Sequence, residues 1–351
     1  MRAVFVLGDE QVVVREIPDP KPGPRQVTVR VKTAGICGSD LLSWHGGPRQ
    51  DLADAGGDAL VPGHEASGVV ELVGDGVTGL RPGDRVVVWA HCAGDCARCA
   101  HTRATEQWFC REGGDTRRRP NQGGDAEILL AQDWQCLRLP SALDFDAGSV
   151  LACDGGTAYQ CLRRLDVTES QTVAILGGGP LGLATLMFAR AMGARTIVAE
   201  SIPDRLELAR SLGADAVIDA AREDAPAAIR ELSGGRGADA VFECSGSDAS
   251  QRDAIEAVRP GGGVGYAGYV SRGGRPEGAI DPAAFIWKQA TLVGCSAYPP
   301  SLFPEVARFA VERRLRLEDL VTHRFRLDDA AEAFRLAGSR RSGKVLLDPS
   351  S

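Results

Sequence analysis

The sequence has no apolar run of the ~18–20 residues that a membrane-spanning helix needs. The apolar run that follows Met1 ends at Leu7 and is far too short for a secretory signal peptide. An excess of positive charge is also missing, because 40 Lys and Arg face 47 Asp and Glu and leave a net charge of −7. These absences predict a cytoplasmic protein with neither a membrane nor a nucleic acid as its partner.

The sequence also lacks internal repeats and low-complexity tracts. Its 351 residues are 44% hydrophobic and 25% charged, which is typical of globular proteins and allows two domains. Glycine is abundant, with 43 residues, and indicates many turns and close backbone contacts. Ten cysteines in a chain expected to stay in a reducing compartment favour metal binding or catalysis over disulfides.

Two patterns of secondary structure divide the chain. Up to about residue 150, short β-rich runs broken by Gly and Pro predict an irregular β domain: Ala3–Val6, Val12–Glu16, Gln26–Ala34, Gly68–Val73 and Arg85–Trp89. From Gly155 onward, strands alternate with helices and predict parallel βαβ units: Thr172–Leu176, Leu181–Met192, Thr196–Glu200, Arg205–Leu212, Ala216–Ile218, Ala225–Leu232, Ala240–Glu243 and Ser250–Val258.

The alternation continues to about Gly294. Residues Pro260–Gly263 read as a turn, and Val264–Ala267 as the strand after it. The last part, with a predicted helix Ala330–Ala337 and a strand Lys344–Leu347, is a tail that could return to the first domain.

A glycine fingerprint follows the strand Thr172–Leu176. Gly177, Gly179 and Gly182 fit G-x-G-x-x-G, directly after an apolar strand and at the start of a helix. In that context glycines allow a tight turn, and backbone N–H groups at the helix N-terminus bind a pyrophosphate. The sequence therefore predicts a dinucleotide site.

Glu200 ends the next strand, eighteen residues after Gly182. An acidic side chain there accepts hydrogen bonds from the adenosine ribose and repels a 2′-phosphate, which favours NAD over NADP. Arg205, five residues further on, suits a position beside the ribose but would also accommodate a phosphate.

Cysteine and histidine residues form two candidate metal sets. Cys37, His64 and Cys153 are far apart in the sequence; two thiolates and an imidazole suit a catalytic zinc with one open position. Lone cysteines are more often small core residues, so spacing alone leaves both interpretations open. Cys92, Cys96, Cys99 and Cys110 form a local set of four thiols, a pattern typical of a closed zinc site.

In their order along the chain, these motifs resemble a zinc-containing alcohol dehydrogenase of the medium-chain dehydrogenase/reductase superfamily. The resemblance covers essentially the whole length and rests on these segments: Cys37-Gly38-Ser39-Asp40, Gly63-His64-Glu65 with Gly68 and Gly74, Pro82–Val86, Gly123-Gly124 with Ala126-Glu127, Gly177–Gly182 and Ser342-Gly343-Lys344. It implies an α/β fold with a GroES-like irregular β-barrel catalytic domain (residues 1–154 and 298–351) and a Rossmann doubly wound parallel-sheet coenzyme domain (residues 155–297).

The resemblance also implies roles for single residues. Cys37, His64 and Cys153 would bind the catalytic zinc, with Glu65 behind them and Asp40 holding His64. Ser39 would bond the substrate oxygen and pass on its proton, and Leu181 would pack behind the nicotinamide. The residues implied to bind NAD are Thr157, Gly177, Gly179, Pro180, Leu181, Gly182, Glu200 and Arg205. Cys153-x3-Thr157 has the alcohol-dehydrogenase form, where polyol relatives usually carry Glu.

Three departures from the family pattern stand out. Cys92 and Cys96 are separated by three residues instead of two, and ten residues instead of about seven precede Cys110, so a structural zinc and free thiols both stay open. Leu42 stands where relatives often carry a proton-relay histidine; His45 either replaces that histidine or is an ordinary loop residue. Asp125 occupies a position that is usually aromatic, and the sequence gives no role for it.

The expected function is the zinc-dependent transfer of a hydride between an alcohol, or its carbonyl product, and NAD, by a homodimer or homotetramer. The nearest alternative is a polyol or sugar-derived substrate with the same mechanism. A zinc-free reductase of the superfamily is a second alternative, and a non-catalytic NAD-binding protein on this fold is a third.

Overall fold

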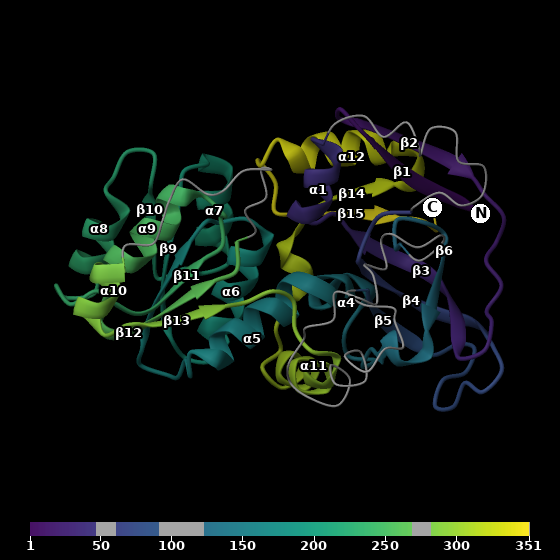
Figure 1. Ribbon diagram of the computed structural model, residues 1–351, viewed down its shortest axis with the longest axis horizontal. Helices are drawn as coiled ribbons and strands as arrows, with labels where there is room; N and C mark the ends of the chain where they lie inside the picture. The colour runs from purple at the N-terminus through teal and green to yellow at the C-terminus, as the bar shows by residue number, and fades with distance from the viewer. Residues whose placement is uncertain (47–60, 91–122, 269–281, 351) are drawn as a thin grey trace. The chain divides into compact units, whose positions relative to one another are not determined.

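The computed structural model describes residues 1–46, 61–90, 123–268 and 282–350 (Figure 1). The chain divides into two compact units. The first comprises Met1–Gly156, Ala297–Ser339 and Lys344–Ser351, and the second comprises Thr157–Ser296 and Arg340–Gly343. Among the described residues, no helix is long and apolar enough to cross a membrane.

The first unit is built on a sheet of seven strands in the order β14-β15-β3-β4-β5-β7, with β6 also paired to β3. All pairings in it are antiparallel except that of β14 with β15. The bounds are β3 (Gln26–Gly35), β4 (Glu65–Val73), β5 (Arg85–Trp89), β6 (Ile128–Gln132), β7 (Cys136–Arg138), β14 (Val321–Arg326) and β15 (Lys344–Asp348). A separate hairpin pairs β1 (Arg2–Gly8) with β2 (Gln11–Glu16). The strands predicted in this half are confirmed, and β15 brings the C-terminal tail against β3.

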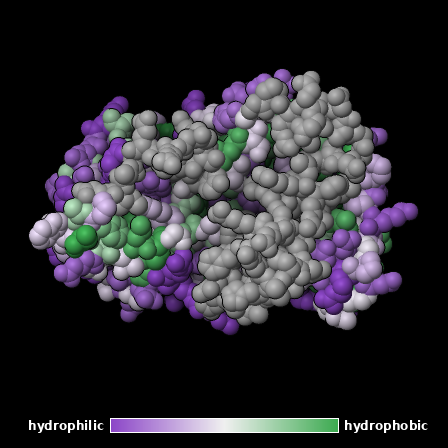
Figure 2. Space-filling model, in the orientation of Figure 1, coloured by the Kyte–Doolittle hydropathy of each residue, from purple (hydrophilic) through white to green (hydrophobic). Residues whose placement is uncertain are grey.

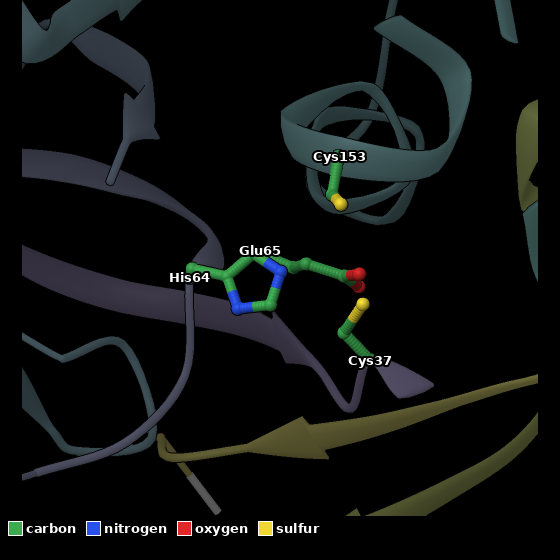
Figure 3. A group of neighbouring side chains, drawn as sticks. All are labelled: Cys37, His64, Glu65 and Cys153. Carbon is green, nitrogen blue, oxygen red and sulfur yellow. The ribbon is translucent and has the colours of Figure 1, made fainter. Parts of the chain in front are cut away.

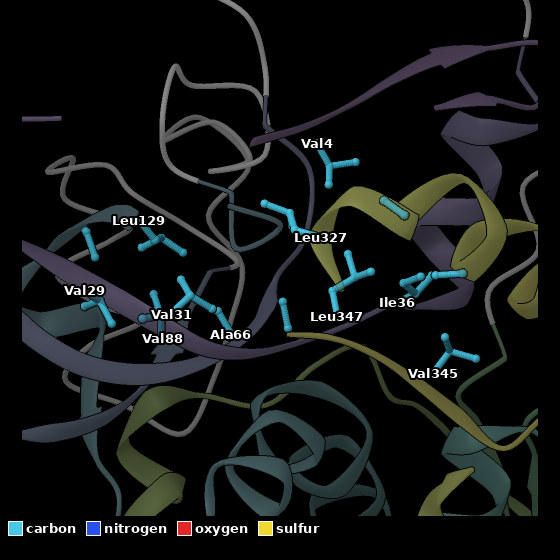
Figure 4. Close-up of a cluster of buried hydrophobic side chains, with 14 of the residues drawn as sticks. Val4, Val29, Val31, Ile36, Ala66, Val88, Leu129, Leu327, Val345 and Leu347 are labelled. Atoms are coloured by element: carbon cyan, nitrogen blue, oxygen red, sulfur yellow. The ribbon is translucent and has the colours of Figure 1, made fainter. Parts of the chain in front are cut away.

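Short helices connect the strands of the first unit: α1 (Gly38–Trp44), η2 (Asp133–Gln135), α4 (Phe145–Val150), η3 (Leu151–Gly155), η4 (Pro300–Leu302), α11 (Phe303–Glu312), η5 (Leu317–Leu320), η6 (Leu327–Asp329) and α12 (Ala330–Gly338). Val29, Val31 and Leu129 of the sheet are buried with Trp44 of α1 and Phe334 of α12 in one apolar cluster (Figure 4). Apolar residues on alternate positions of the strands therefore give this unit its core.

The second unit contains six parallel strands in the order β10-β9-β8-β11-β12-β13. Their bounds are β8 (Thr172–Leu176), β9 (Arg195–Glu200), β10 (Ala216–Asp219), β11 (Ala238–Glu243), β12 (Val258–Tyr266) and β13 (Thr291–Gly294). The first strand of this sheet, β8, lies in its middle. The next two strands, β9 and β10, follow on one side of β8, and β11, β12 and β13 follow on the other. Because crossovers between parallel strands are right-handed in nearly all proteins, this strand order places helices on both faces of the sheet, which is the doubly wound arrangement.

The helices of this unit are α5 (Gly156–Arg164), which begins in the first unit, α6 (Pro180–Ala191), α7 (Pro203–Ser211), α8 (Ala225–Leu232), α9 (Asp248–Ala257) and α10 (Pro282–Lys288). The predicted βαβ alternation is thus confirmed. The predicted turn at Pro260–Gly263 is wrong, because β12 runs from Val258 to Tyr266. The pairing with β11 jumps from Ala238↔Val258 to Ala240↔Gly263, so the glycines form a bulge within the strand, with Gly261 at φ +70°.

Candidate metal centre and dinucleotide site

Four side chains from distant parts of the sequence converge in the first unit. The ligand atoms of Cys37, His64, Glu65 and Cys153 all lie within 4.8 Å of one another. Figure 3 shows the two sulfur atoms, the imidazole and the carboxylate pointing toward a common point. The structure therefore brings together the three residues that the sequence predicts as zinc ligands, and adds the carboxylate of Glu65.

Local structure positions each of the four. Cys37 lies between the end of β3 and the start of α1, where it is the N-cap residue. His64 immediately precedes β4, and Glu65 is the first residue of that strand. Cys153 lies in η3, a π-helical turn between α4 and α5. Such turns are rare and are often found at functional sites, since they change the direction of a side chain within a helix.

Asp40 joins two members of the group. Its Oδ2 accepts a hydrogen bond of 2.9 Å from the backbone N–H of Cys37, and its Oδ1 lies 3.3 Å from Nδ1 of His64. Both Asp40 and His64 are 3% exposed. A carboxylate on Nδ1 fixes the orientation of the ring and leaves Nε2 as the nitrogen for a metal, which is the usual arrangement of a zinc-binding histidine.

The thiols and the imidazole interact strongly even without a metal. The hydrogen bond with Cys153 lowers the pKa of Cys37 well below its usual range, although burial acts in the opposite direction. Burial lowers the pKa of His64, but the carboxylate of Asp40 and the thiol of Cys37 outweigh it and raise that pKa well above its usual value. The same hydrogen bond between the two thiols, followed by burial, raises the pKa of Cys153 well above its usual value.

The donor set fits zinc. Two sulfurs and one nitrogen in a buried group are the ligands that Zn²⁺ prefers, and three protein ligands leave a fourth position for substrate. The second predicted set, Cys92, Cys96, Cys99 and Cys110, lies outside the described residues.

Ser39 and His45 lie in different environments. Ser39 is half-buried in α1, two residues after Cys37. His45 is the C-cap residue of the same helix; its side chain is 50% exposed, and its Nδ1 lies 3.1 Å from Oε1 of Glu10. His45 is not part of the convergent group of four.

A buried lysine completes this region and has no role in the sequence prediction. Lys344, the first residue of β15, is 0% exposed. It forms ion pairs with Glu65 and with Asp154, the latter at 2.7 Å. Burial lowers the pKa of Lys344, but the two carboxylates outweigh it and raise that pKa well above its usual value. In the sequence, Lys344 belongs to the Ser342-Gly343-Lys344 motif and begins the predicted strand Lys344–Leu347, and neither signal gives its side chain a role.

The glycine fingerprint has the predicted strand–turn–helix context in the second unit. Gly177 follows β8 with φ +102°, and Gly179 is the N-cap of α6, with Pro180 at the first helical position. A Cβ at Gly182 would lie 1.8 Å from the carbonyl oxygen of Gly177. Only glycine at residue 182 therefore lets the helix start this close to the turn.

Glu200 is tied to the backbone around the fingerprint. Its Oε2 accepts a hydrogen bond of 2.7 Å from Gly178 N–H, and its Oε1 accepts bonds of 2.6 and 3.0 Å from the N–H groups of Ser201 and Ile202. Arg205 donates from Nε to the carbonyl oxygen of Ser342 at 3.0 Å. Burial lowers the pKa of Arg205, and nearby Glu200 partly offsets this effect.

The remaining predicted coenzyme residues lie at helix starts. Leu181 is partly exposed at the start of α6, where its carbonyl oxygen accepts a hydrogen bond from the hydroxyl of Thr185. Thr157, near the start of α5, is 5% exposed, and its buried hydroxyl has no hydrogen-bond partner in the described part of the chain. That hydroxyl is a free hydrogen-bonding group at the start of the second unit.

Asp125, the other departure from the family pattern, is 0% exposed. Neither of its carboxylate oxygens has a hydrogen-bond partner among the described residues. Burial, followed by the charge of Asp40, raises the pKa of Asp125 well above its usual value. A neutral carboxyl group is the form that this environment favours.

The chain is similar to known proteins along its whole length. Residues 23–141 match the family described as alcohol dehydrogenase GroES-like domain, and residues 180–312 match the family described as zinc-binding dehydrogenase. An uncharacterised zinc-type alcohol dehydrogenase-like protein of Escherichia coli, YphC, is 33% identical over 99% of this chain and 98% of its own length. Human sorbitol dehydrogenase is 29% identical over 99% of this chain and 96% of its own. The solved structure of the alcohol dehydrogenase TADH from Thermus sp. ATN1 superposes with a TM-score of 0.86 at 33% identity, covering 99% of each chain.

Proposed function

Because this chain belongs to the zinc-binding alcohol dehydrogenases of the medium-chain dehydrogenase/reductase superfamily, we propose that it oxidises an alcohol with NAD, or reduces the carbonyl product in the reverse direction. The observation that carries the proposal is the convergence of Cys37, His64 and Cys153 on one point. The chain is a zinc-dependent dehydrogenase by family, and the alcohol and NAD are the proposed specificity.

The two units divide the work. We assign catalysis to a GroES-like domain of residues 1–154 and 298–351, and coenzyme binding to a Rossmann domain of residues 155–297. The first unit contains the convergent group of four, and the second contains the glycine fingerprint at the point where the strand order reverses between β8 and β11. In open parallel sheets, dinucleotides bind at that point.

At the metal centre, Cys37, His64 and Cys153 would hold zinc, and Asp40 would keep the His64 ring in place. Zinc bound there supplies a Lewis acid that stabilises negative charge on the substrate oxygen. Ser39, two residues after Cys37, would accept the hydroxyl proton of the substrate. His45 would then carry the proton to solvent, since its ring is half-exposed and Glu10 lies beside it.

In the coenzyme domain, the turn at Gly177 and Gly179 would receive the pyrophosphate at the N-terminus of α6, with Pro180 and Gly182 shaping that turn. Leu181 would support the nicotinamide ring, and the free hydroxyl of Thr157 would bond to it. Glu200 would accept the ribose hydroxyls, and its charge disfavours the 2′-phosphate of NADP, while Arg205 would flank the ribose. The nicotinamide of bound NAD supplies the hydride acceptor.

A polyol is the second candidate substrate, because the sequence match to human sorbitol dehydrogenase covers nearly the full length of both chains. Against it stands the Cys153-x3-Thr157 motif, which has the alcohol-dehydrogenase form, whereas polyol relatives usually carry Glu there. Cys92, Cys96, Cys99 and Cys110 would hold a second, structural zinc.

We further propose a homodimer or homotetramer in the cytoplasm. The support is an apolar area on the second unit that includes Ile286 and Trp287 of α10, 72% and 85% exposed, and Leu292 of β13, 38% exposed (Figure 2). In the described part of the chain, β13 is the last strand of its sheet, so one of its edges is available for pairing.

The test is the initial rate of NADH formation over a panel of simple alcohols and polyols, repeated with NADP. We expect turnover with NAD, a clear preference for one alcohol class, and loss of activity in Cys153→Ala. The matched control is Cys136→Ala, which removes a buried thiol of β7 outside the metal centre and should keep activity. Turnover unaffected by Cys153→Ala would contradict the proposal, and a preference for NADP would contradict the role given to Glu200.

A further inference from the structure

Two buried thiols meet in the second unit. Cys161 lies in α5 and is 1% exposed, and Cys295 directly follows β13 and is 6% exposed. Their side chains are hydrogen-bonded to each other. Neither residue belongs to the metal centre or to the residues assigned to NAD, so the proposed reaction leaves this pair without a role.

The register of the sheet places both thiols on one face. Gly265 of β12 pairs with Val293 of β13, and Cys295 continues the pairing because its N–H donates to the carbonyl oxygen of Tyr266 at 2.8 Å. Side chains alternate between the two faces along a strand, so Cys295, two residues after Val293, lies on the face of Gly265. A Cβ at Gly265 would lie 2.7 Å from Sγ of Cys161, so α5 covers the same face.

Glycines in β12 let α5 come this close to the sheet. A Cβ at Gly263 would lie 2.8 Å from Cδ2 of Leu165, which is one helical turn after Cys161. A side chain at Gly263 or Gly265 would push α5 outward and separate Cys161 from the end of β13. The contact between the two thiols therefore depends on the backbone of both elements.

An arginine lies beside the Cys295 thiol. Arg164, three residues after Cys161 in α5, donates to this thiol and to the carbonyl oxygen of Gly294. Arg164 is exposed, and so are both sequence neighbours of Cys295. The Cys295 thiol thus lies directly beneath the surface, where a small oxidant has a short path to it.

The two thiols differ in reactivity. The hydrogen bond with Cys161, supported by the charge of Arg164, lowers the pKa of Cys295, although burial acts in the opposite direction. Burial, followed by the hydrogen bond with Cys295, raises the pKa of Cys161 well above its usual value. Since the thiolate is the nucleophilic form of cysteine, Cys295 is the thiol that attacks an oxidant, and Cys161 is placed to react with the product.

We propose that Cys295 and Cys161 are a redox modification site, which forms a reversible disulfide when the protein meets a peroxide. The Cys295 thiolate attacks one oxygen of hydrogen peroxide, and the O–O bond breaks. The released hydroxide takes up the thiol proton and leaves as water, so that Cys295 becomes a sulfenic acid.

The second step closes the disulfide. The sulfur of Cys161 attacks the sulfur of Cys295, the S–S bond forms and the S–O bond breaks. The departing hydroxide takes the proton of Cys161 and leaves as a second water. Two thiols are thereby oxidised by two electrons, and one peroxide is reduced to two waters, with no contribution from zinc or NAD.

The bond would tie α5 to the end of β13. The chain between Cys161 and Cys295 contains the whole six-stranded sheet of the second unit. A disulfide across so long a loop restricts the unfolded chain and stabilises the fold. The oxidised protein should therefore melt about 4–16 °C above the reduced protein, at the usual strength of a disulfide.

The experiment treats the full-length, zinc-loaded protein with hydrogen peroxide, blocks the remaining thiols, and maps the peptides by mass spectrometry without reduction. We expect a cross-link between the peptides of Cys161 and Cys295, which a phosphine reductant cleaves, together with the rise in melting temperature. Cys136 of β7 is the matched control. It is 7% exposed, like Cys295, but burial and the charge of Asp133 raise its pKa, so it should stay reduced.

Three variants separate the roles of the residues. Cys161→Ser should stop at the sulfenic acid, which dimedone labels on Cys295. Cys295→Ser should show neither label nor cross-link at Cys161 and should lose the rise in melting temperature. Arg164→Gln should form the cross-link more slowly, because it lacks the charge that favours the thiolate. If Cys161→Ser does not fold, Cys161→Ala provides the same comparison.

The outcomes distinguish this inference from the proposed function. A cross-link from Cys295 to Cys244, or further oxidation of Cys295 while Cys161 stays a free thiol, would overturn the assigned pair. A Cys295 that stays reduced while other thiols of the chain are oxidised would overturn the inference and leave the metal centre untouched. Absence of zinc from the wild-type protein would contradict the metal centre, but the disulfide should still form.

Discussion

Replacement of Gly182 by alanine tests the dinucleotide site where the structure constrains it most. The added Cβ would lie 1.8 Å from the carbonyl oxygen of Gly177 and 3.3 Å from Cγ2 of Ile175. Because a Cβ does not come closer than about 3.0 Å to such an atom, the turn and α6 must separate by about 1 Å. Overpacking of this kind costs about 1–3 kcal/mol.

This cost falls on the turn proposed to receive the pyrophosphate. We expect Gly182→Ala to lower the melting temperature by about 2–12 °C, at about 2–4 °C per kcal/mol for a domain of this size. We expect its Kd for NAD to rise at least about tenfold, which corresponds to about 1.4 kcal/mol. Differential scanning calorimetry and isothermal titration calorimetry measure the two effects.

The matched control for this substitution is Gly294→Ala in the edge strand β13. No atom lies within 4 Å of a Cβ placed there, so melting temperature and NAD affinity should stay close to wild type. The reasoning is refuted if Gly182→Ala melts and binds NAD like wild type, or if Gly294→Ala causes the same losses.

Three further substitutions test other parts of the structure. Asp125→Asn should be more stable than wild type by a margin that grows as the pH rises above 3.8. The pKa of Asp125 is raised in the folded state, so the wild-type protein loses stability as the pH rises, whereas the asparagine does not titrate; urea unfolding at several pH values measures the difference in the free energy of unfolding. Phe334→Ala, which removes a side chain 0% exposed in the core of the first unit, should lower the free energy of unfolding by about 3–5 kcal/mol in the same assay. Glu200→Ala should weaken NAD binding by about 10–100-fold and reduce the preference over NADP, because it removes a charged hydrogen-bond acceptor; unchanged cofactor preference in titration calorimetry would count against the role of Glu200.

Local patterns in the sequence predicted much of the architecture. Strands such as Arg85–Trp89 and Thr172–Leu176 were predicted to the residue, since each begins directly after a polar residue, Asp84 or Gln171. The fingerprint was also predictable, because strand, glycine turn and helix follow one another without interruption. The convergence of Cys37, His64 and Cys153 was predictable only through the family resemblance, as nothing local brings them together.

Other features depend on contacts between distant segments. The partners of Lys344 come from β3, β4 and η3, so no pattern around Ser342-Gly343-Lys344 indicates them. The bulge in β12 was predicted as a turn because Pro and three Gly usually end a strand, but pairing with β11 and β13 continues the strand past them. No interaction of the described residues explains why Asp125 replaces an aromatic residue.

Zinc content per chain, measured by elemental analysis on protein purified without added metal, tests the central claim most directly. We predict bound zinc in wild type and the loss of one ion per chain in Cys153→Ala, while Cys136→Ala keeps the wild-type content and both variants stay folded by circular dichroism. Any zinc that remains in Cys153→Ala would belong to the cysteines between Cys92 and Cys110. Folded wild-type protein that binds NAD but contains no zinc would contradict the metal centre built from Cys37, His64 and Cys153.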